Sequence, residues 1–170
     1  MGEEIVNKVA KSGLVTLDLG ELAPKGERAD FDLASHLWQG LVLKEKDFRE
    51  MVKTNDWSQY QDKYVAVFCS ADAILQDWAF MLVVSALQPF ARRVVVGTPE
   101  TMETVLFTEA IQAVNPEEYR DARIVVKGCG DFKIPSAAFA EVVNHLQPHV
   151  RSIMYGEPCS TVPVYKRPKK

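Results

Sequence analysis

The sequence predicts a single α/β domain with an open, mainly parallel sheet of flavodoxin-like or Rossmann-like strand order. From Tyr64 onward, short β-branched runs alternate with helical patterns in the order βαβαβαβ. Consecutive parallel strands need a crossover, which is usually a helix and is almost always right-handed. Runs such as Val94-Val95-Val96 are apolar throughout, which is typical of strands buried on both faces. The length of 170 residues suits one domain of this class.

The expected elements divide near Trp57 into an N-terminal α+β extension at 1–57 and a βα core at 58–165, followed by a basic tail at 166–170. In the core we expect strands at 64–68, 93–96, 123–126 and 152–155, and helices at 74–90, 102–114 and 136–146. In the extension we expect a helix at 3–10, a strand at 14–19 and a helix at 44–53, which cover the sheet or extend its edge. No internal repeat is evident from the residues.

Composition narrows the function classes. The chain has 20 basic and 23 acidic residues and a formal charge of −3, which does not indicate a nucleic-acid surface. Its start, Met1-Gly2-Glu3-Glu4, lacks the basic region and the apolar core of a signal peptide, and no apolar run approaches the ~20 residues that cross a bilayer. We therefore expect a cytoplasmic protein with no membrane partner.

The three cysteines are the most chemically specific feature. Cys69 ends the first core strand, Cys129 follows the third and Cys159 follows the fourth. The carboxyl ends of parallel strands form one edge, where ligands bind in open α/β sheets. A strand order of 2-1-3-4 would make the cysteine-bearing strands neighbours within about 10 Å, close enough for three sulfurs to reach one ion. The sequence thus predicts a metal-binding protein with a three-cysteine site for zinc or an iron–sulfur cluster.

The fourth ligand of such a site stays open. Three cysteines with an open position would suit catalytic zinc or a cluster with a labile iron, whereas a fourth protein ligand would suit structural zinc. The residues considered for this position are Asp72, Asp77, Asp131, Glu157 and His36.

Two alternatives need no metal. In the first, the chain is a thiol-based redox enzyme or sulfur carrier, with Cys69 as the nucleophile at a helix N-terminus and a second cysteine that resolves it. In the second, the thiols are inert and the chain is a non-enzymatic interaction module, since buried cysteine is common in cores.

The chain resembles a bacterial family known as domain of unknown function 2480. The resemblance lies in the segments Glu4–Ala10, Leu14–Asp18, Lys44–Arg49, Cys69–Ile74, Val126–Cys129 and Gly156–Pro163, and it extends over nearly the whole length. The family implies no activity. It does imply an association with iron–sulfur assembly proteins, which makes them the expected partners and favours iron or zinc at the thiol site.

Overall fold

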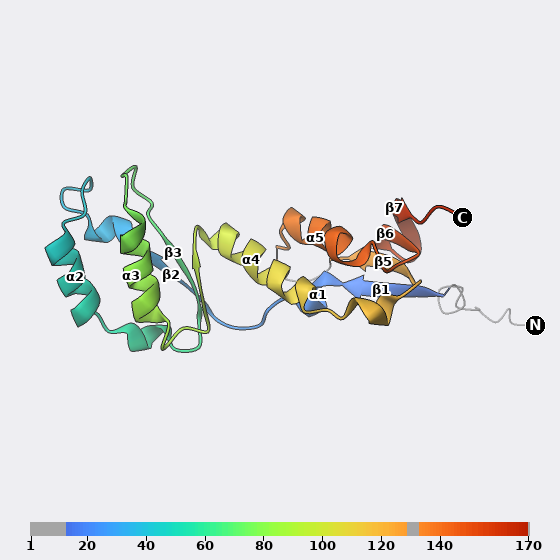
Figure 1. Ribbon diagram of the computed structural model, residues 1–170, viewed down its shortest axis with the longest axis horizontal. Coiled ribbons are helices and arrows are strands. Elements are labelled where there is room, and N and C mark those ends of the chain that lie inside the picture. Colours follow the sequence, from blue (N-terminus) through green and yellow to red (C-terminus); the bar gives the residue numbers. More distant parts are fainter. Residues whose placement is uncertain (1–12, 129–132, 170) are drawn as a thin grey trace, which may run out of the picture. The chain divides into compact units, whose positions relative to one another are not determined.

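The computed structural model describes residues 13–128 and 133–169 (Figure 1). Its strands are β1 (Leu14–Asp18), β2 (Arg28–Asp32), β3 (Tyr64–Phe68), β4 (Arg93–Val96), β5 (Arg123–Lys127), β6 (Ser152–Glu157) and β7 (Ser160–Lys166). Its α-helices are α1 (Leu19–Leu22), α2 (Glu45–Thr54), α3 (Asp77–Leu87), α4 (Pro99–Gln112) and α5 (Ser136–Leu146), and short 3₁₀ helices are η1 (Leu33–His36), η2 (Trp57–Tyr60) and η3 (Pro116–Tyr119).

The predicted fold class is confirmed, and the strands form two sheets. One sheet has the order β2-β3-β4 and the other the order β1-β5-β6-β7; all pairs are parallel except β6 with β7. The chain correspondingly forms two compact units. We call Lys25–Val105 the central unit, and Met1–Pro24 with Leu106–Lys170 the terminal unit.

In the central unit, α2 and α3 pack on one face of the sheet. Phe31, Val65 and Val67 point to this face because side chains alternate along a strand. They meet Phe48 and Val52 of α2, together with Ala79, Val83 and Leu87 of α3, which recur at helical spacing along one stripe. The buried indole of Trp57 donates from Nε1 to Val52 O at 2.7 Å and so holds η2 against α2.

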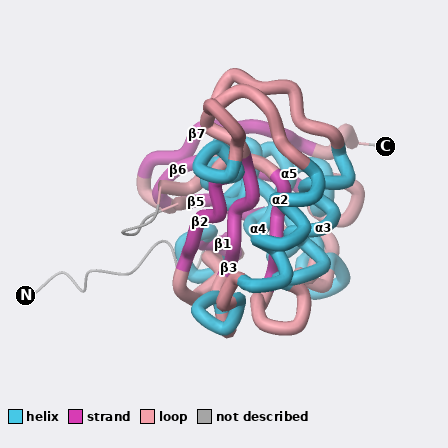
Figure 2. Tube along the Cα trace, turned by 90° about the vertical axis from the view of Figure 1, so that its left-hand side faces the viewer, coloured by secondary structure: helices cyan, strands magenta, loops and turns pink. Residues whose placement is uncertain are grey.

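In the terminal unit, α5 and the last turns of α4 pack on one face of the other sheet. Ile124, Val126 and Ile153 line this face, and they meet side chains of both helices: Phe107, Ile111, Ala138, Val142 and Leu146. Figure 2 shows β5, β6 and β7 side by side, with strands in magenta. The antiparallel strand β7 closes the β6 side of this sheet.

The two units repeat one another, which the sequence alone did not reveal. Residues of the central unit match residues 59 positions later in the terminal unit, as the pair Asp62 and Asp121 illustrates. Identical pairs in this register include Phe48/Phe107, Tyr60/Tyr119, Val67/Val126, Ala79/Ala138, Phe80/Phe139, Val83/Val142, Val84/Val143, Leu87/Leu146, Pro89/Pro148, Arg92/Arg151 and Gly97/Gly156. Helix α3 thus corresponds to α5, strand β3 to β5, and strand β4 to β6.

The hydrogen bonds repeat as well. Asp62 and Asp121 both have positive φ, 60° and 57°, a conformation that Asp tolerates better than most residues. Asp62 N donates to Phe90 O at 3.0 Å, and Asp121 N donates to His149 O at 2.9 Å. The same turn therefore joins helix and strand in both units, and the repeat is structural as well as sequential.

The remaining expectations compare with the structure as follows. The strands at 64–68 and 93–96 and the helix at 136–146 have the predicted bounds, whereas the helix expected at 74–90 is the shorter α3. Strand β7 was not predicted. The helix expected at 3–10 lies outside the described residues, and the single-domain organisation with its boundary near residue 57 stays a prediction.

Candidate functional site

The two predicted cysteine ligands that the structure describes belong to different sheets and to different units. Cys69 follows β3 in the central unit, and Cys159 lies in the β6–β7 turn of the terminal unit, where it is exposed. Cys129 and Asp131 lie outside the described residues. The three-cysteine site required β3 to lie beside β5. Strand β3 instead pairs with β2 and β4.

The prediction of a metal-binding protein with a three-cysteine site is therefore wrong. Among residues 13–128 and 133–169, no group of three His, Cys, Asp or Glu side chains could hold a metal ion. The physical reason is that β2, rather than β5, occupies the far side of β3. The role of zinc or an iron–sulfur cluster at any one cysteine, and the expected iron–sulfur assembly partners, stay predictions.

Asp32, at the end of β2, forms hydrogen bonds that connect two segments at the carboxyl edge of the central sheet. Its Oδ1 accepts from Ala34 N and from Ser70 N, each at 2.9 Å, and its Oδ2 accepts from Ser70 Oγ at 2.5 Å. Burial alone would raise the pKa of Asp32, but the hydrogen bonds from Ser70 and Ala34 outweigh it, so the pKa lies below its usual value. This carboxylate caps η1 and ties β2 to the loop after β3.

His36, one of the proposed fourth ligands, lies against aromatic rings. Its ring stacks on Phe31 with centroids 5.4 Å apart, and it meets Phe48 edge-on at 6.5 Å. Burial lowers the pKa of His36, although the nearby Asp32 acts in the opposite direction. These contacts suit a neutral packing histidine at pH 7.

A charged cluster occupies the matching edge of the terminal sheet. Lys127 Nζ lies 3.2 Å from Asp18 Oδ2 and 4.0 Å from Glu157 Oε2. Asp18 is the counterpart of Asp32. Asp18 ends β1, which pairs with β5, and Asp32 ends β2, which pairs with β3, the counterpart of β5. Each aspartate caps the helical turn that follows it. Glu157, one of the proposed fourth ligands, thus lies within ion-pair distance of a lysine.

Cys69 lines a small cavity at the carboxyl ends of β3 and β4. The cavity is about 340 Å³ and also reaches Gly97 and Thr98, which precede α4. Cys69 Sγ lies 3.7 Å from Ala71 O. Asp72 is exposed in the loop after Cys69, and α3 begins only at Asp77, eight residues after this cysteine.

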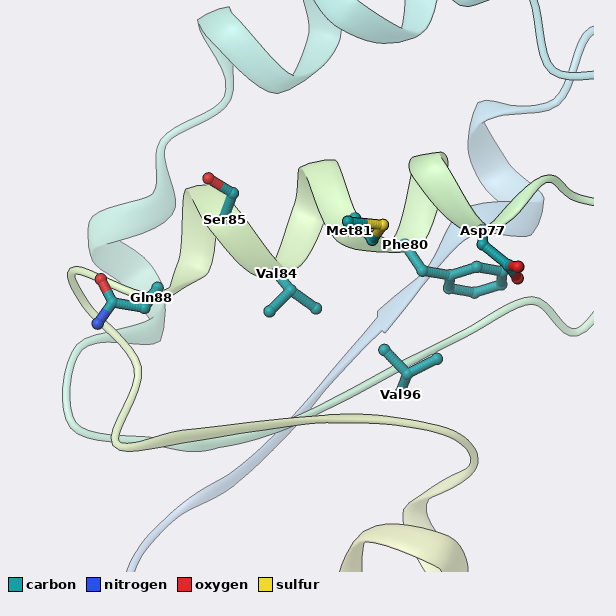
Figure 3. Close-up of a pocket in the computed structure, with 7 residues that line it drawn as sticks. All are labelled: Asp77, Phe80, Met81, Val84, Ser85, Gln88 and Val96. Atoms are coloured by element: carbon teal, nitrogen blue, oxygen red, sulfur yellow. The ribbon is translucent and has the colours of Figure 1, made fainter.

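A larger, apolar cavity continues from this one along the edge of the central sheet, and Phe80 and Val96 line both. We call it the α3–β4 groove; it is about 600 Å³ and is lined by Asp77, Phe80, Met81, Val84, Ser85, Gln88 and Val96. Figure 3 shows Val84 and Phe80 of α3 above Val96 of β4. Asp77 is the single charged side chain of this lining.

The groove is unusually apolar for a surface. Met81 is 69% exposed and Val96 is 51% exposed. Helix α3 already buries Ala79, Val83 and Leu87 on its other face, so it is apolar on both sides. A helix that is apolar all round is normally covered on both sides. An exposed apolar surface of this kind indicates an interaction site.

The fold and the groove define a small α/β protein with an apolar cleft beside an edge strand. The chain belongs to the family described as protein of unknown function (DUF2480), whose family model matches residues 3–167. The predicted resemblance is thus confirmed. No curated protein and no solved structure matches the chain.

No helix within the described ranges has both the length and the apolar character needed to cross a membrane.

Sequence reasoning missed the groove, although one signal for it was present. The segment Trp78–Leu87 is too apolar for a helix with one solvent-facing side. Burial in the core and burial by a partner give the same residue pattern, so the segment alone predicts only a buried helix.

Proposed function

We propose that the protein is a self-associating interaction module, in which the α3–β4 groove accepts β4 of a second copy as an antiparallel strand. The observation that supports this proposal is the repeat. In the terminal unit, the position beside β6 is occupied by the antiparallel strand β7. In the central sheet, β4 is the counterpart of β6, and no strand of the described part of the chain pairs with its outer edge.

The side chains around the two positions correspond. In the terminal unit, Phe139 of α5 meets Tyr155 of β6 with ring centroids 5.5 Å apart, and Tyr155 pairs with Val162 of β7. Their counterparts in the central unit, Phe80 and Val96, line the groove. The groove therefore has the shape of a site that holds a strand in the other repeat.

The edge of β4 offers backbone groups for such a strand. Gly97 N donates to Val67 O of β3 at 2.9 Å. Because successive residues of a strand point their N–H and C=O groups to opposite sides, Val94 and Val96 point theirs away from β3. Val94 O accepts from Arg93 Nη1 at 2.7 Å, and a docking strand would replace this bond.

A second copy fits this edge better than an unrelated segment. A twofold axis perpendicular to the sheet pairs β4 with β4 in the antiparallel sense and sets both α3 helices on the same face. The apolar Met81 and Val84 of each copy then cover one another, which removes their surface from water. The same operation sets the Asp77 end of one groove opposite the Gln88 end of the other, so the two carboxylates stay apart.

The test is the mass of the full chain in solution, measured by sedimentation equilibrium at micromolar concentration. We expect twice the chain mass of 19.1 kDa. Val96→Glu should give the monomer, because a carboxylate buried beside the edge strand is costly to desolvate. Met81→Glu, on the helix, should do the same without altering the strand.

The matched control is Val164→Glu in β7. Val164 is 53% exposed, close to the 51% of Val96, and also lies on a strand. This variant should remain a dimer, and circular dichroism should show all three variants folded. A monomeric wild type, or a dimer that only Val164→Glu dissociates, would overturn the proposal.

The expected cytoplasmic location belongs to the same proposal. Fractionation of the native host tests it: recovery from the periplasmic or membrane fraction would contradict it.

A further inference from the structure

A second site lies in the terminal unit, on the face of its sheet that α5 does not cover. Arg123 and Ser152 are register partners on β5 and β6, and Ser152 pairs with Lys166 of β7. Ile124 and Ile153 point to the core beneath α5, so their strand neighbours Arg123 and Ser152 point to the opposite face. Arg123, Arg151 and Lys166 therefore gather at one end of this face.

These side chains line a cavity, which we call the basic cleft. It is about 350 Å³ and is lined by Arg123, Arg151, Ser152, Met154, Pro163, Tyr165 and Lys166. A second cavity of about 260 Å³ shares Arg151 and Lys166 and adds Arg167 and Lys169. Five cations thus surround two adjoining hollows in a chain whose formal charge is −3.

Three of these five cations have no acidic partner among the described residues. Within residues 13–128 and 133–169, Asp121 is the one acidic residue that lines either cavity, and it forms an ion pair with Arg167. Among the described residues, Arg151, Lys166 and Lys169 have no carboxylate partner, and Arg151 and Lys166 are exposed. Cations held together without counter-charges repel one another and favour a bound anion.

The repeat shows that the central unit uses the same arginine differently. The counterpart of Arg151 is Arg92, which donates from Nη1 to Lys25 O at 3.0 Å and lies over the Tyr64 ring at 5.3 Å. The counterpart of Tyr64 in the terminal unit is Arg123. An arginine–aromatic stack in one unit is thus replaced by two guanidinium groups on one cavity in the other.

We propose that the basic cleft binds a small molecule that carries two or more phosphate groups. Guanidinium groups bind phosphate oxygens in pairs, and lysine adds a point charge. Several unbalanced cations suit a multiply charged anion better than a single carboxylate. Met154, Pro163 and Tyr165 supply an apolar floor for the rest of the ligand, and the cavity volume lies in the range of small-molecule sites.

The test is calorimetric titration of the full chain with inorganic tripolyphosphate at low ionic strength. We expect one site per chain, with an affinity that falls as salt is added because screening weakens exposed charges. Arg151→Ala and Lys166→Ala should each weaken binding about tenfold, as expected for loss of one charge-assisted contact. Both side chains are exposed, so the variants should keep the wild-type melting temperature.

The control for Lys166→Ala is Lys46→Ala. Lys46 is an exposed lysine of α2 in the central unit, so this variant makes the same change in net charge. Its affinity for tripolyphosphate should stay within about twofold of wild type, because Lys46 lines neither cavity. Equal weakening by both lysine variants would show a diffuse charge effect and overturn the site.

Citrate separates the two ligand chemistries. It carries several carboxylates and no phosphate, and we expect it to bind at least about tenfold more weakly than tripolyphosphate, because phosphate groups take the bidentate contacts. Citrate binding as tight as tripolyphosphate, or no binding of tripolyphosphate at millimolar concentration, would overturn the proposal.

Discussion

The central and terminal units share one scaffold but differ in what covers it. In α3, Met81 is exposed and Leu82 is partly buried, whereas the matching positions of α5 hold Ala140 and Glu141. Glu141 Oε1 accepts from Gln112 Nε2 at 2.9 Å, so the terminal unit has polar contacts where the central unit has apolar side chains. Strand β7 adds a further difference, because it lies beside β6 while β4 is the last strand of its sheet.

This difference separates the demands of folding from those of binding. Positions that both units keep identical, such as Leu87 and Leu146, are buried in the two cores. Some positions that differ lie on the two proposed sites: Met81 on the groove corresponds to Ala140, and Arg123 on the basic cleft corresponds to Tyr64. The repeat therefore serves as an internal control. A side chain that the fold requires should recur at the matching position of the other unit, and an exposed side chain that occurs in one unit needs another explanation.

The largest effect that tests this comparison is cavity formation in the two cores. Leu87 and Leu146 are both 0% exposed and occupy matching positions of α3 and α5. Leu87→Ala and Leu146→Ala should each cost about 3 kcal/mol in the free energy of unfolding, the usual loss for a buried leucine. Urea unfolding of each variant measures this. A cost below about 1 kcal/mol for one of them would show that the units do not use the repeat in the same way.

A smaller change in the free energy of unfolding should distinguish alanine substitutions at the ends of β4 and β6. Gly97 and Gly156 are matching glycines with φ of 144° and 119°, so a side chain at either is strained. A Cβ at Gly156 would lie 2.6 Å from the backbone oxygen of Ser160, whereas one at Gly97 would lie 2.7 Å from the side chain of Thr101. Backbone yields less than a side chain, so Gly156→Ala should cost about 2 kcal/mol and Gly97→Ala about 1 kcal/mol.

A second change at Thr101 tests the proposed cause. Thr101→Ser removes the methyl group nearest to the new Cβ, so in the Gly97→Ala background it should restore part of the lost stability. No restoration would assign the whole cost to the backbone conformation. Equal costs at both glycines would contradict the distinction between side chain and backbone.

The sequence predicted the local elements well because local patterns specify them. The β-branched run at Arg93–Val96 and the helical stripe of Ser136–Leu146 are readable without tertiary contacts. Strand pairing is not specified locally: the partners of β3 come from residues 28–32 and 93–96, and nothing in Tyr64–Phe68 selects them over β5. The cysteine site failed for this reason, since it depended on which strands are neighbours.

The repeat and the two proposed sites were harder to predict for other reasons. Identity between the repeats is concentrated at buried positions and at turns, so most aligned pairs look unrelated. Strand β7 contains Pro163, which weakens the strand pattern in the sequence, but β7 is an edge strand, where proline is tolerated. The basic cleft joins residues of three strands and appears only when the sheet is assembled.

The smallest expected effect concerns the two capping aspartates that match across the units. Asp32→Ala should cost about 1 kcal/mol near pH 7, because it removes the cap of η1 and the bonds from Ser70. The pKa of Asp32 in the folded protein lies below its usual value, so its contribution is present above the pKa of the unfolded chain and is lost as pH falls through the folded pKa. The difference between wild type and variant should therefore shrink as the pH is lowered below about 4.

Asp18→Ala is the matched control in the terminal unit, where the aspartate caps α1 and contacts Lys127 instead of a serine. Its cost should depend on salt, because an ion pair is screened, whereas the cost of Asp32→Ala, which removes hydrogen bonds from Ser70 and Ala34, should change little. Urea unfolding at two salt concentrations and several pH values measures both. If the cost of Asp32→Ala were constant from neutral to acidic pH, its hydrogen bonds would not depend on the carboxylate charge, and the two edges would be held by the same uncharged capping interaction.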